Sequence, residues 1–235
     1  MTGTGIGWNR VIGGEETEFG VSGLLYNTNL MPYDRKTNSV WSQQRLDCVN
    51  GELIGQEAET YSLFETSWGT WKRMFPESLV LNTSTGFSRN YSRYPYGDYR
   101  ENDESLLFPV NNRDDRLPLK ERVLGVIHQN EVTAYPFSDE KSGLELIEDV
   151  IGGLPVVVVR SSTDNFIVAF DNTLETDFTL IEGALPHILR DPDGNDYNIF
   201  GFSDSTNKRL HKPEQFIGYW FSWGAFYPNV DIYSD

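Results

Sequence analysis

The densest group of oxygen-bearing side chains in the sequence is the run Asp-Pro-Asp-Gly-Asn-Asp that begins at Asp191. Asp191, Asp193 and Asn195 have the spacing of positions 1, 3 and 5 in a calcium-binding loop, where alternate side chains converge on one hard cation. The sixth position is Asp196, where an EF-hand requires glycine, and the twelfth is a phenylalanine, where it requires glutamate. The segment is therefore not an EF-hand, but Asp191, Asp193, Asn195 and Asp196 are candidate ligands for Ca²⁺.

The same residues also suit a plain turn between two strands. Asp-Gly-Asn is a composition that tight hairpins favour, because these residues tolerate the required backbone angles. A related block, Asp34-x-x-x-Asn38-Ser39, lies in the first part of the chain and offers a second, poorer candidate for a cation. The sequence alone leaves the turn and the calcium site as alternatives.

A second candidate set lies in the mixed-charge segment 114–122, Asp-Asp-Arg-Leu-Pro-Leu-Lys-Glu-Arg. Arg116 and Lys120 are four residues apart and could clamp a carboxylate or stabilise an oxyanion. Asp115 or Asp34 would then activate a water molecule as a general base. A solvated face with local ion pairs also accounts for this segment, and such pairs contribute little to stability.

Short β-strands are expected to position these groups. Residues 166–170 are a short apolar run, with Phe166, Val168 and Phe170 on one face of a strand. Residues 156–159 are all valine, which is typical of a strand buried on both faces. Asn-Thr, Gly-Gly and Asp-Gly pairs mark the turns between such runs.

One short helix is expected, and a second segment has the same pattern, although Gly218 and Gly224 count against a helix there. The first begins after Thr66 or Ser67, either of which can cap it, and ends before Pro76. Its Trp-x-x-Trp-x-x-x-Phe-Pro pattern, which begins at Trp68, returns as Trp-x-x-Trp-x-x-x-Tyr-Pro from Trp220. This repeated helical spacing favours tryptophans packed in the core, whereas a surface that stacks on sugars or acyl chains is the alternative. The predicted fold class is mainly β with a few short helices.

Three sequence blocks recur in the same order and indicate an internal repeat. They are the tryptophan block, the Asp34 and Asp191 blocks, and Trp8-Asn9, which is echoed by Phe170-Asp171. We therefore expect residues 1–235 to form a single compact domain. It would be built from two weakly related halves, about 1–82 and 160–235, around a middle segment of about 83–159. If the halves have pseudo-two-fold symmetry, the cleft between them is the expected place for a site.

Composition excludes several classes of protein. The 19 Lys and Arg residues against 35 Asp and Glu residues give a net charge of −16, which repels nucleic acid and anionic membranes. The longest apolar run is too short to span a bilayer, and no signal peptide is visible. The single cysteine, Cys48, excludes an internal disulfide.

The whole chain resembles a bacterial family, the domain-of-unknown-function family 3179. The resemblance is carried by FGVSGLLYN, YDRKTNSVWSQ, FPESLVL, YPYGDY, DDRLPLKERVLGV and GYWFSWGAFYP, at residues 19–27, 33–43, 75–81, 94–99, 114–126 and 218–228. The resemblance implies an exported or lipid-anchored protein with no settled activity, and hence an extracytoplasmic location. Family members usually carry a YCPL segment before the GTGIGW stretch, and here Met1 and Thr2 stand where that segment would end.

Two functions are consistent with these residues. The first is a Ca²⁺-assisted hydrolase of a small ester or lactone, in which Asp34 or Asp115 activates water and Arg116 or Lys120 stabilises the oxyanion. The second is a non-catalytic, exported binding module for a glycan or a cell-surface partner. The tyrosine-rich segment 91–99 and the acidic composition favour the second. Exposed tyrosines in a groove would support the binding module, whereas buried ones would count against it.

Overall fold

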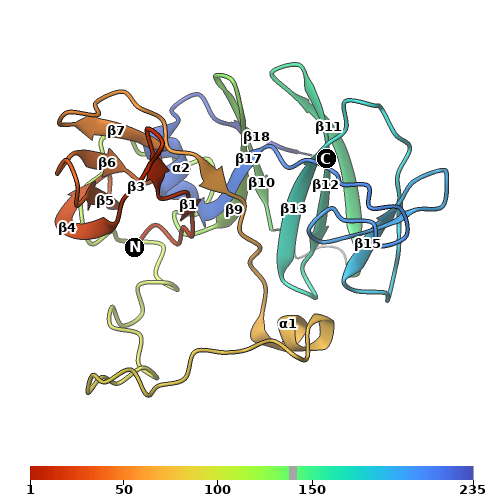
Figure 1. Ribbon diagram of the computed structural model, residues 1–235, viewed down its shortest axis with the longest axis horizontal. Helices are drawn as coiled ribbons and strands as arrows, with labels where there is room; N and C mark the ends of the chain where they lie inside the picture. Colours follow the sequence, from red (N-terminus) through yellow and green to blue (C-terminus); the bar gives the residue numbers. More distant parts are fainter. Residues whose placement is uncertain (138–141, 235) are drawn as a thin grey trace.

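The computed structural model describes residues 1–137 and 142–234 and shows a mainly β protein with two short helices in that part of the chain (Figure 1). The fold class predicted from the sequence is therefore confirmed. Neither described helix is long and apolar enough to cross a membrane.

The strands of the first half form one antiparallel sheet and two small ribbons. The sheet has the order β4-β5-β6-β7, made of Phe19–Tyr26, Asn29–Asp34, Val40–Ser42 and Asp47–Asn50. The ribbons pair β1 (Gly7–Trp8) with β8 (Thr60–Tyr61), and β2 (Val11–Ile12) with β3 (Glu15–Glu16).

Three further sheets follow in the second part of the chain. One has the order β17-β9-β10-β18, made of Glu214–Tyr219, Arg122–His128, Glu131–Pro136 and Asp231–Ile232. The next is β11-β12-β13, made of Glu145–Ile151, Leu154–Ser161 and Phe166–Asp171. The last is β14-β15-β16, made of Thr179–Leu180, His187–Arg190 and Asp196–Asn198.

The sheets pack in layers, with β9, β10, β17 and β18 in the middle of the molecule (Figure 1). The sheet β11-β12-β13 is buried on both faces, because the four valines of β12 alternate between two core clusters. Val157 and Val159 pack in the cluster with Ile188 from β15, whereas Val156 and Val158 pack in the cluster with Leu124 from β9. This confirms the prediction of a strand buried on both faces.

The two helices lie where the repeated pattern predicted them. Helix α1 (Trp68–Met74) begins after Ser67, whose side chain accepts a hydrogen bond from the Thr70 backbone N–H at 3.1 Å. Helix α2 (Trp220–Phe226) follows β17 directly and is almost wholly buried. The prediction that the tryptophans pack in the core is right for the pair in α2. It is wrong for Trp68, which begins α1 and is 52% exposed.

The two aspartate blocks of the repeat adopt the same local structure. Asp34 ends β5 and accepts a hydrogen bond from Trp41 Nε1 in β6 at 3.2 Å. Asp191 directly follows β15 and accepts one from the Tyr197 hydroxyl in β16 at 2.9 Å. In each half, a buried carboxylate thus joins the end of one strand to an aromatic side chain on the next. A pseudo-two-fold arrangement of the halves stays a prediction.

Candidate functional site

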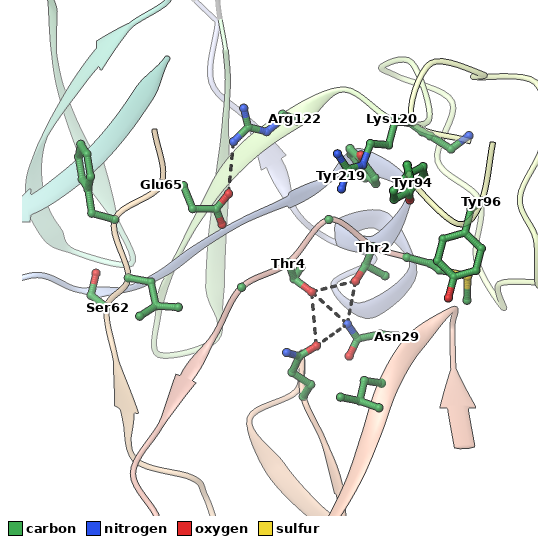
Figure 2. Close-up of a pocket in the computed structure, with 18 of the residues that line it drawn as sticks. Thr2, Thr4, Asn29, Ser62, Glu65, Tyr94, Tyr96, Lys120, Arg122 and Tyr219 are labelled. Carbon is green, nitrogen blue, oxygen red and sulfur yellow. Dashed lines mark hydrogen bonds and ion pairs between the residues drawn. The ribbon is translucent and has the colours of Figure 1, made fainter. Parts of the chain in front are cut away.

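A cavity of about 1180 Å³ lies where the N-terminal segment meets the linker between β8 and α1. Its wall combines residues 1–5, residues 62–65, part of the tyrosine-rich segment, and residues at the start of β9 and the end of β17. Figure 2 shows Glu65 and Arg122 on one side of this cavity, Tyr94 and Tyr96 on the other, and Thr2 and Thr4 between them. Segments far apart in the sequence therefore build one polar and aromatic wall.

A network of amide and hydroxyl groups fixes the N-terminal segment. The Asn29 side chain, 2% exposed, donates to Thr2 Oγ1 at 2.9 Å and to Gln43 Oε1 at 3.1 Å. The Tyr219 backbone N–H donates to the Thr2 carbonyl at 2.8 Å. The Gln43 oxygen accepts this hydrogen bond. Its amide nitrogen, Nε2, makes no hydrogen bond within the described residues and can donate to a ligand.

Glu65 and Arg122 form an ion pair in the wall. Arg122 contacts Glu65 Oε2 at 3.3 Å and donates to Asn165 Oδ1 at 2.9 Å, so its guanidinium is held from two sides. Burial raises the pKa of Glu65, and the positive charge of Arg122 opposes this rise without cancelling it. Within the described part of the chain, Glu65 Oε1 makes no hydrogen bond and can accept one from a ligand.

Lys120 holds the loop that carries the tyrosines. Its ammonium group donates to the carbonyl oxygens of Asn102 and of Ser105, the latter at 2.8 Å, and lies 4.4 Å from the centre of the Tyr99 ring. Its backbone N–H donates to Asp103 Oδ1 at 2.7 Å. Lys120 is 6% exposed, and this burial lowers the pKa of its amine. Lys120 therefore positions the loop, because its N–H groups are already used.

Arg100 and two tyrosines form the aromatic side of the cavity. The Arg100 guanidinium lies 4.0 Å from the centre of the Tyr94 ring, and the Tyr94 and Tyr96 rings are 5.6 Å apart in an edge-to-face arrangement. Tyr96 is 48% exposed. Arg100 makes no ion pair with any residue of the described ranges 1–137 and 142–234. Tyr96 is thus accessible in the cavity wall, whereas Tyr94 is half-buried and Tyr99, in the same segment, is 4% exposed.

The predicted calcium ligands lie elsewhere, and their hydrogen bonds leave little room for a cation. Asn195 donates from its backbone and its side chain to Asp191, and the Tyr197 hydroxyl donates to the same carboxylate. Burial alone would raise the pKa of Asp191, but these hydrogen bonds bring it below its usual value. Asp193 is exposed near Lys208, at 3.5 Å. Asp196 pairs with Arg190 at 2.5 Å.

Hydrogen bonds already occupy the carboxylate oxygens that would bind calcium in this turn. Both oxygens of Asp191 accept hydrogen bonds, and Asn195 presents N–H groups to the carboxylate. In the described residues, no group of three or more His, Cys, Asp or Glu side chains is placed to hold a metal ion. The turn between β15 and β16 accounts for the spacing of these residues, because it brings Asn195 and Tyr197 to the Asp191 carboxylate. Calcium binding stays a prediction.

An alanine at position 191 is expected to destabilise the protein equally with and without calcium. Loss of the carboxylate leaves the buried N–H groups of Asn195 and the Tyr197 hydroxyl without an acceptor, at a cost of about 1–3 kcal/mol. Urea unfolding of wild type and Asp191→Ala, each in chelator and in millimolar calcium, measures this loss. A calcium-induced gain in stability that is present in wild type and absent in Asp191→Ala would instead show a metal site.

The structure brings only two of the four predicted catalytic residues together, because Asp115 and Arg116 line one surface pocket while Asp34 and Lys120 lie elsewhere. Asp34 is buried at the end of β5, and its carboxylate accepts hydrogen bonds from the Thr37 and Lys36 backbone N–H groups at 2.6 and 3.2 Å. Arg116 pairs with Asp114 at 2.6 Å, while Asp115 is exposed and pairs with a neighbouring arginine. Sheets that carry β5 and β15 lie at opposite ends of the molecule (Figure 1). Of the predicted catalytic residues, Lys120 lines the large cavity.

Sequence reasoning did not identify Glu65, Arg122 or Gln43 as site residues. They lie in three segments that meet only in the folded chain, and although Gln43 and Arg122 fall in blocks that carry the family resemblance, nothing in those blocks marks them as site residues. The sequence did indicate the aromatic side of the cavity, because tyrosines and arginines cluster in segment 89–100.

The fold and the cavity define a β-rich protein with a polar, tyrosine-walled cavity of ligand size. The chain belongs to the family described as protein of unknown function (DUF3179), whose model matches residues 1–230. Neither curated proteins nor solved structures gave a significant match.

Proposed function

We propose that this protein is a binding module and that the large cavity binds a glycan. The observation that carries the proposal is the tyrosine pair in the cavity wall, formed by the exposed Tyr96 and the half-buried Tyr94, beside groups that can form hydrogen bonds. A tyrosine ring presents an apolar face and a polar hydroxyl, which suits the apolar face and the hydroxyl groups of a sugar ring. A few polar groups placed in such a wall would orient the ligand.

Three polar groups are available to sugar hydroxyls in this cavity. Gln43 Nε2 can donate and Glu65 Oε1 can accept, as described above, and the Tyr219 hydroxyl can do either. The cavity volume of about 1180 Å³ exceeds the range of about 300–1,000 Å³ that is usual for small-molecule sites. This size favours a short oligosaccharide over a single sugar.

The proposal includes no chemical step, which distinguishes it from the hydrolase hypothesis. Hydrolysis of an ester or lactone needs a base, a water molecule and an oxyanion donor within reach of one another. Asp34 and Asp115 do not line the cavity, and the Lys120 N–H groups already bind loop carbonyls. A glycan-binding role outside the cytoplasm also agrees with the export that the sequence resemblance implies.

Replacement of Tyr96 by alanine is expected to weaken glycan binding about ten-fold. Loss of one stacking ring removes about 1–2 kcal/mol of binding free energy. A screen of immobilised oligosaccharides against the wild-type chain identifies a ligand, and calorimetry then compares the dissociation constants of the variants.

Tyr91→Ala is the matched control. Tyr91 is in the same segment and is 50% exposed, as against 48% for Tyr96, but it does not line the large cavity. Its replacement should leave the dissociation constant unchanged. A wild-type protein that binds no glycan, or a ligand that tolerates Tyr96→Ala as well as Tyr91→Ala, would contradict the proposed function.

A further inference from the structure

The charge of the cavity wall is opposite to that of the whole protein. The chain has a net charge of −16. The residues that line the cavity include three cations, Arg100, Lys120 and Arg122, and one carboxylate, Glu65. A concave site lined by one sign of charge concentrates ligands of the opposite sign. The wall therefore favours an anion in a protein that otherwise repels anions.

Two of the three cations already have partners within the fold. The Arg122 guanidinium contacts Glu65 at 3.3 Å and Asn165 at 2.9 Å. The Lys120 ammonium binds the carbonyl oxygens of Asn102 and Ser105. The charge of Arg122 is thus paired with the Glu65 carboxylate, and the Lys120 ammonium is held by loop carbonyls.

Arg100 differs from both. In the described ranges it makes no hydrogen bond or ion pair, and its contact is with the face of the Tyr94 ring at 4.0 Å. A guanidinium that stacks on a ring keeps its N–H groups free, since they point outward in its own plane. The positive charge of Arg100 also opposes the larger effect of burial, which raises the pKa of Tyr219 in the same wall. The positive charge of Arg100 thus contributes to the electrostatic potential inside the cavity.

We propose that the glycan bound here is acidic, with a hexuronic acid whose carboxylate accepts two parallel N–H bonds from Arg100. The inference rests on the proposed function and specifies its ligand. Arginine and carboxylate match in a planar, bidentate geometry. The sugar ring that bears the carboxylate lies against Tyr96, and Glu65 Oε1 and Gln43 Nε2 are left for hydroxyl groups of the neighbouring sugar rings.

A single carboxylate fits this wall better than a phosphate does. One available guanidinium neutralises one negative charge, whereas a phosphate ester carries about −1.5 to −2 at neutral pH. Glu65 in the same wall and the net charge of −16 add repulsion that a dianion would feel more strongly.

The experiment compares a trisaccharide of galacturonic acid with the same trisaccharide as its methyl ester. Methylation removes the charge and leaves the rings and hydroxyl groups in place. Calorimetry at low salt should show that wild type binds the acid about ten- to a hundred-fold more tightly than the ester, as expected for charge-assisted hydrogen bonds. In Arg100→Gln, the acid should bind as weakly as the ester does, and ester binding should be unchanged.

Arg93→Gln is the matched control, because Arg93 is an exposed arginine of the same segment outside the large cavity. It changes the net charge equally and should keep the preference for the acid. Circular dichroism confirms that both variants are folded.

The outcomes separate the two proposals. Equal binding of acid and ester by wild type would overturn the acidic specificity while leaving glycan binding intact. Tighter binding of a phosphorylated trisaccharide than of the uronic acid would also overturn it. Failure of wild type to bind any trisaccharide in this series or any glycan in the screen would overturn both proposals.

Discussion

Replacing Trp223 by alanine should lower the free energy of unfolding by about 3–5 kcal/mol, as is typical when a buried aromatic side chain is truncated. Trp223 is fully buried in α2 and stacks on Phe216 of β17 with ring centres 4.4 Å apart. It also contacts the Tyr227 ring at 5.2 Å. Denaturant unfolding of wild type and Trp223→Ala measures this loss. The neighbouring side chains cannot fill the cavity left by the indole, because β17 and α2 hold them in place.

Replacement of Gly125 in β9 tests the same packing in the opposite direction, by adding a side chain instead of removing one. A Cβ atom at this position would lie 2.1 Å from the Trp223 ring, so the indole occupies the space that a side chain would need. Gly125→Ala should therefore destabilise the protein by about 1–3 kcal/mol through overpacking. In a Trp223→Leu background, the same substitution should cost less, because the smaller side chain leaves room for the methyl group.

Gly69→Ala is the control for glycine replacement as such. Gly69 lies in α1, and the nearest atom to its added Cβ would be 3.8 Å away. This substitution should be neutral or should stabilise the protein by about 0.5–1 kcal/mol, since alanine favours helix. Equal losses in Gly125→Ala and Gly69→Ala, or additive losses in the Gly125 and Trp223 double variant, would contradict the packing argument.

The elements of the fold could be predicted where the sequence pattern is local. The Trp-x-x-Trp-x-x-x-aromatic-Pro pattern located both helices, because helical spacing, a capping residue and a terminating proline act within one segment. The valine run of β12 likewise indicated burial on both faces. Exposure was not predictable for Trp68, because it depends on which layer α1 meets in the folded chain.

The surroundings of the candidate site residues could not be predicted from the sequence, because the same residue types occur both in turns and in ligand-binding sites. An aspartate that accepts hydrogen bonds in a turn has the spacing of one that binds calcium, and Asp191 does the former. Lys120 was predicted to stabilise an oxyanion; it lines the large cavity, and its ammonium binds loop carbonyls, which the sequence did not indicate. Arg100 was visible within the tyrosine-rich segment, but its distance to Glu65 across the cavity depends on tertiary structure alone.

The unfolding free energy of wild type, measured relative to Lys212→Met, should rise by about 2–3 kcal/mol between pH 8 and pH 10.5. Lys212 is partly buried, and its ammonium lies 5.4 Å from the centre of the Phe170 ring and 5.7 Å from that of Phe200. Burial, with a smaller effect from the positive charge of Arg209, lowers the pKa of Lys212 to about 8. Among the described residues, no acceptor stabilises its charged form by a hydrogen bond or ion pair.

The sign follows from the proton count of the two states. An unfolded lysine has a pKa of about 10.4, whereas in the folded protein the pKa of Lys212 is about 8. Between these values the unfolded state binds more protons, so stability increases with pH. Below pH 8 the Lys212 amine is protonated in both states, so the buried charge lowers the free energy of unfolding by its full amount. The shift of about two units, at about 1.4 kcal/mol per unit, gives the expected size.

Urea unfolding at intervals from pH 7 to pH 10.5 should show the wild-type stability rising relative to that of Lys212→Met. The difference between the two proteins isolates Lys212 from other groups that titrate in this range. Lys72→Met, which removes an exposed lysine of α1, controls for the loss of one positive charge. If the curves of wild type and Lys212→Met run parallel throughout, the Lys212 amine keeps its charge in the fold, and Phe170 and Phe200 stabilise the ammonium rather than excluding water from it.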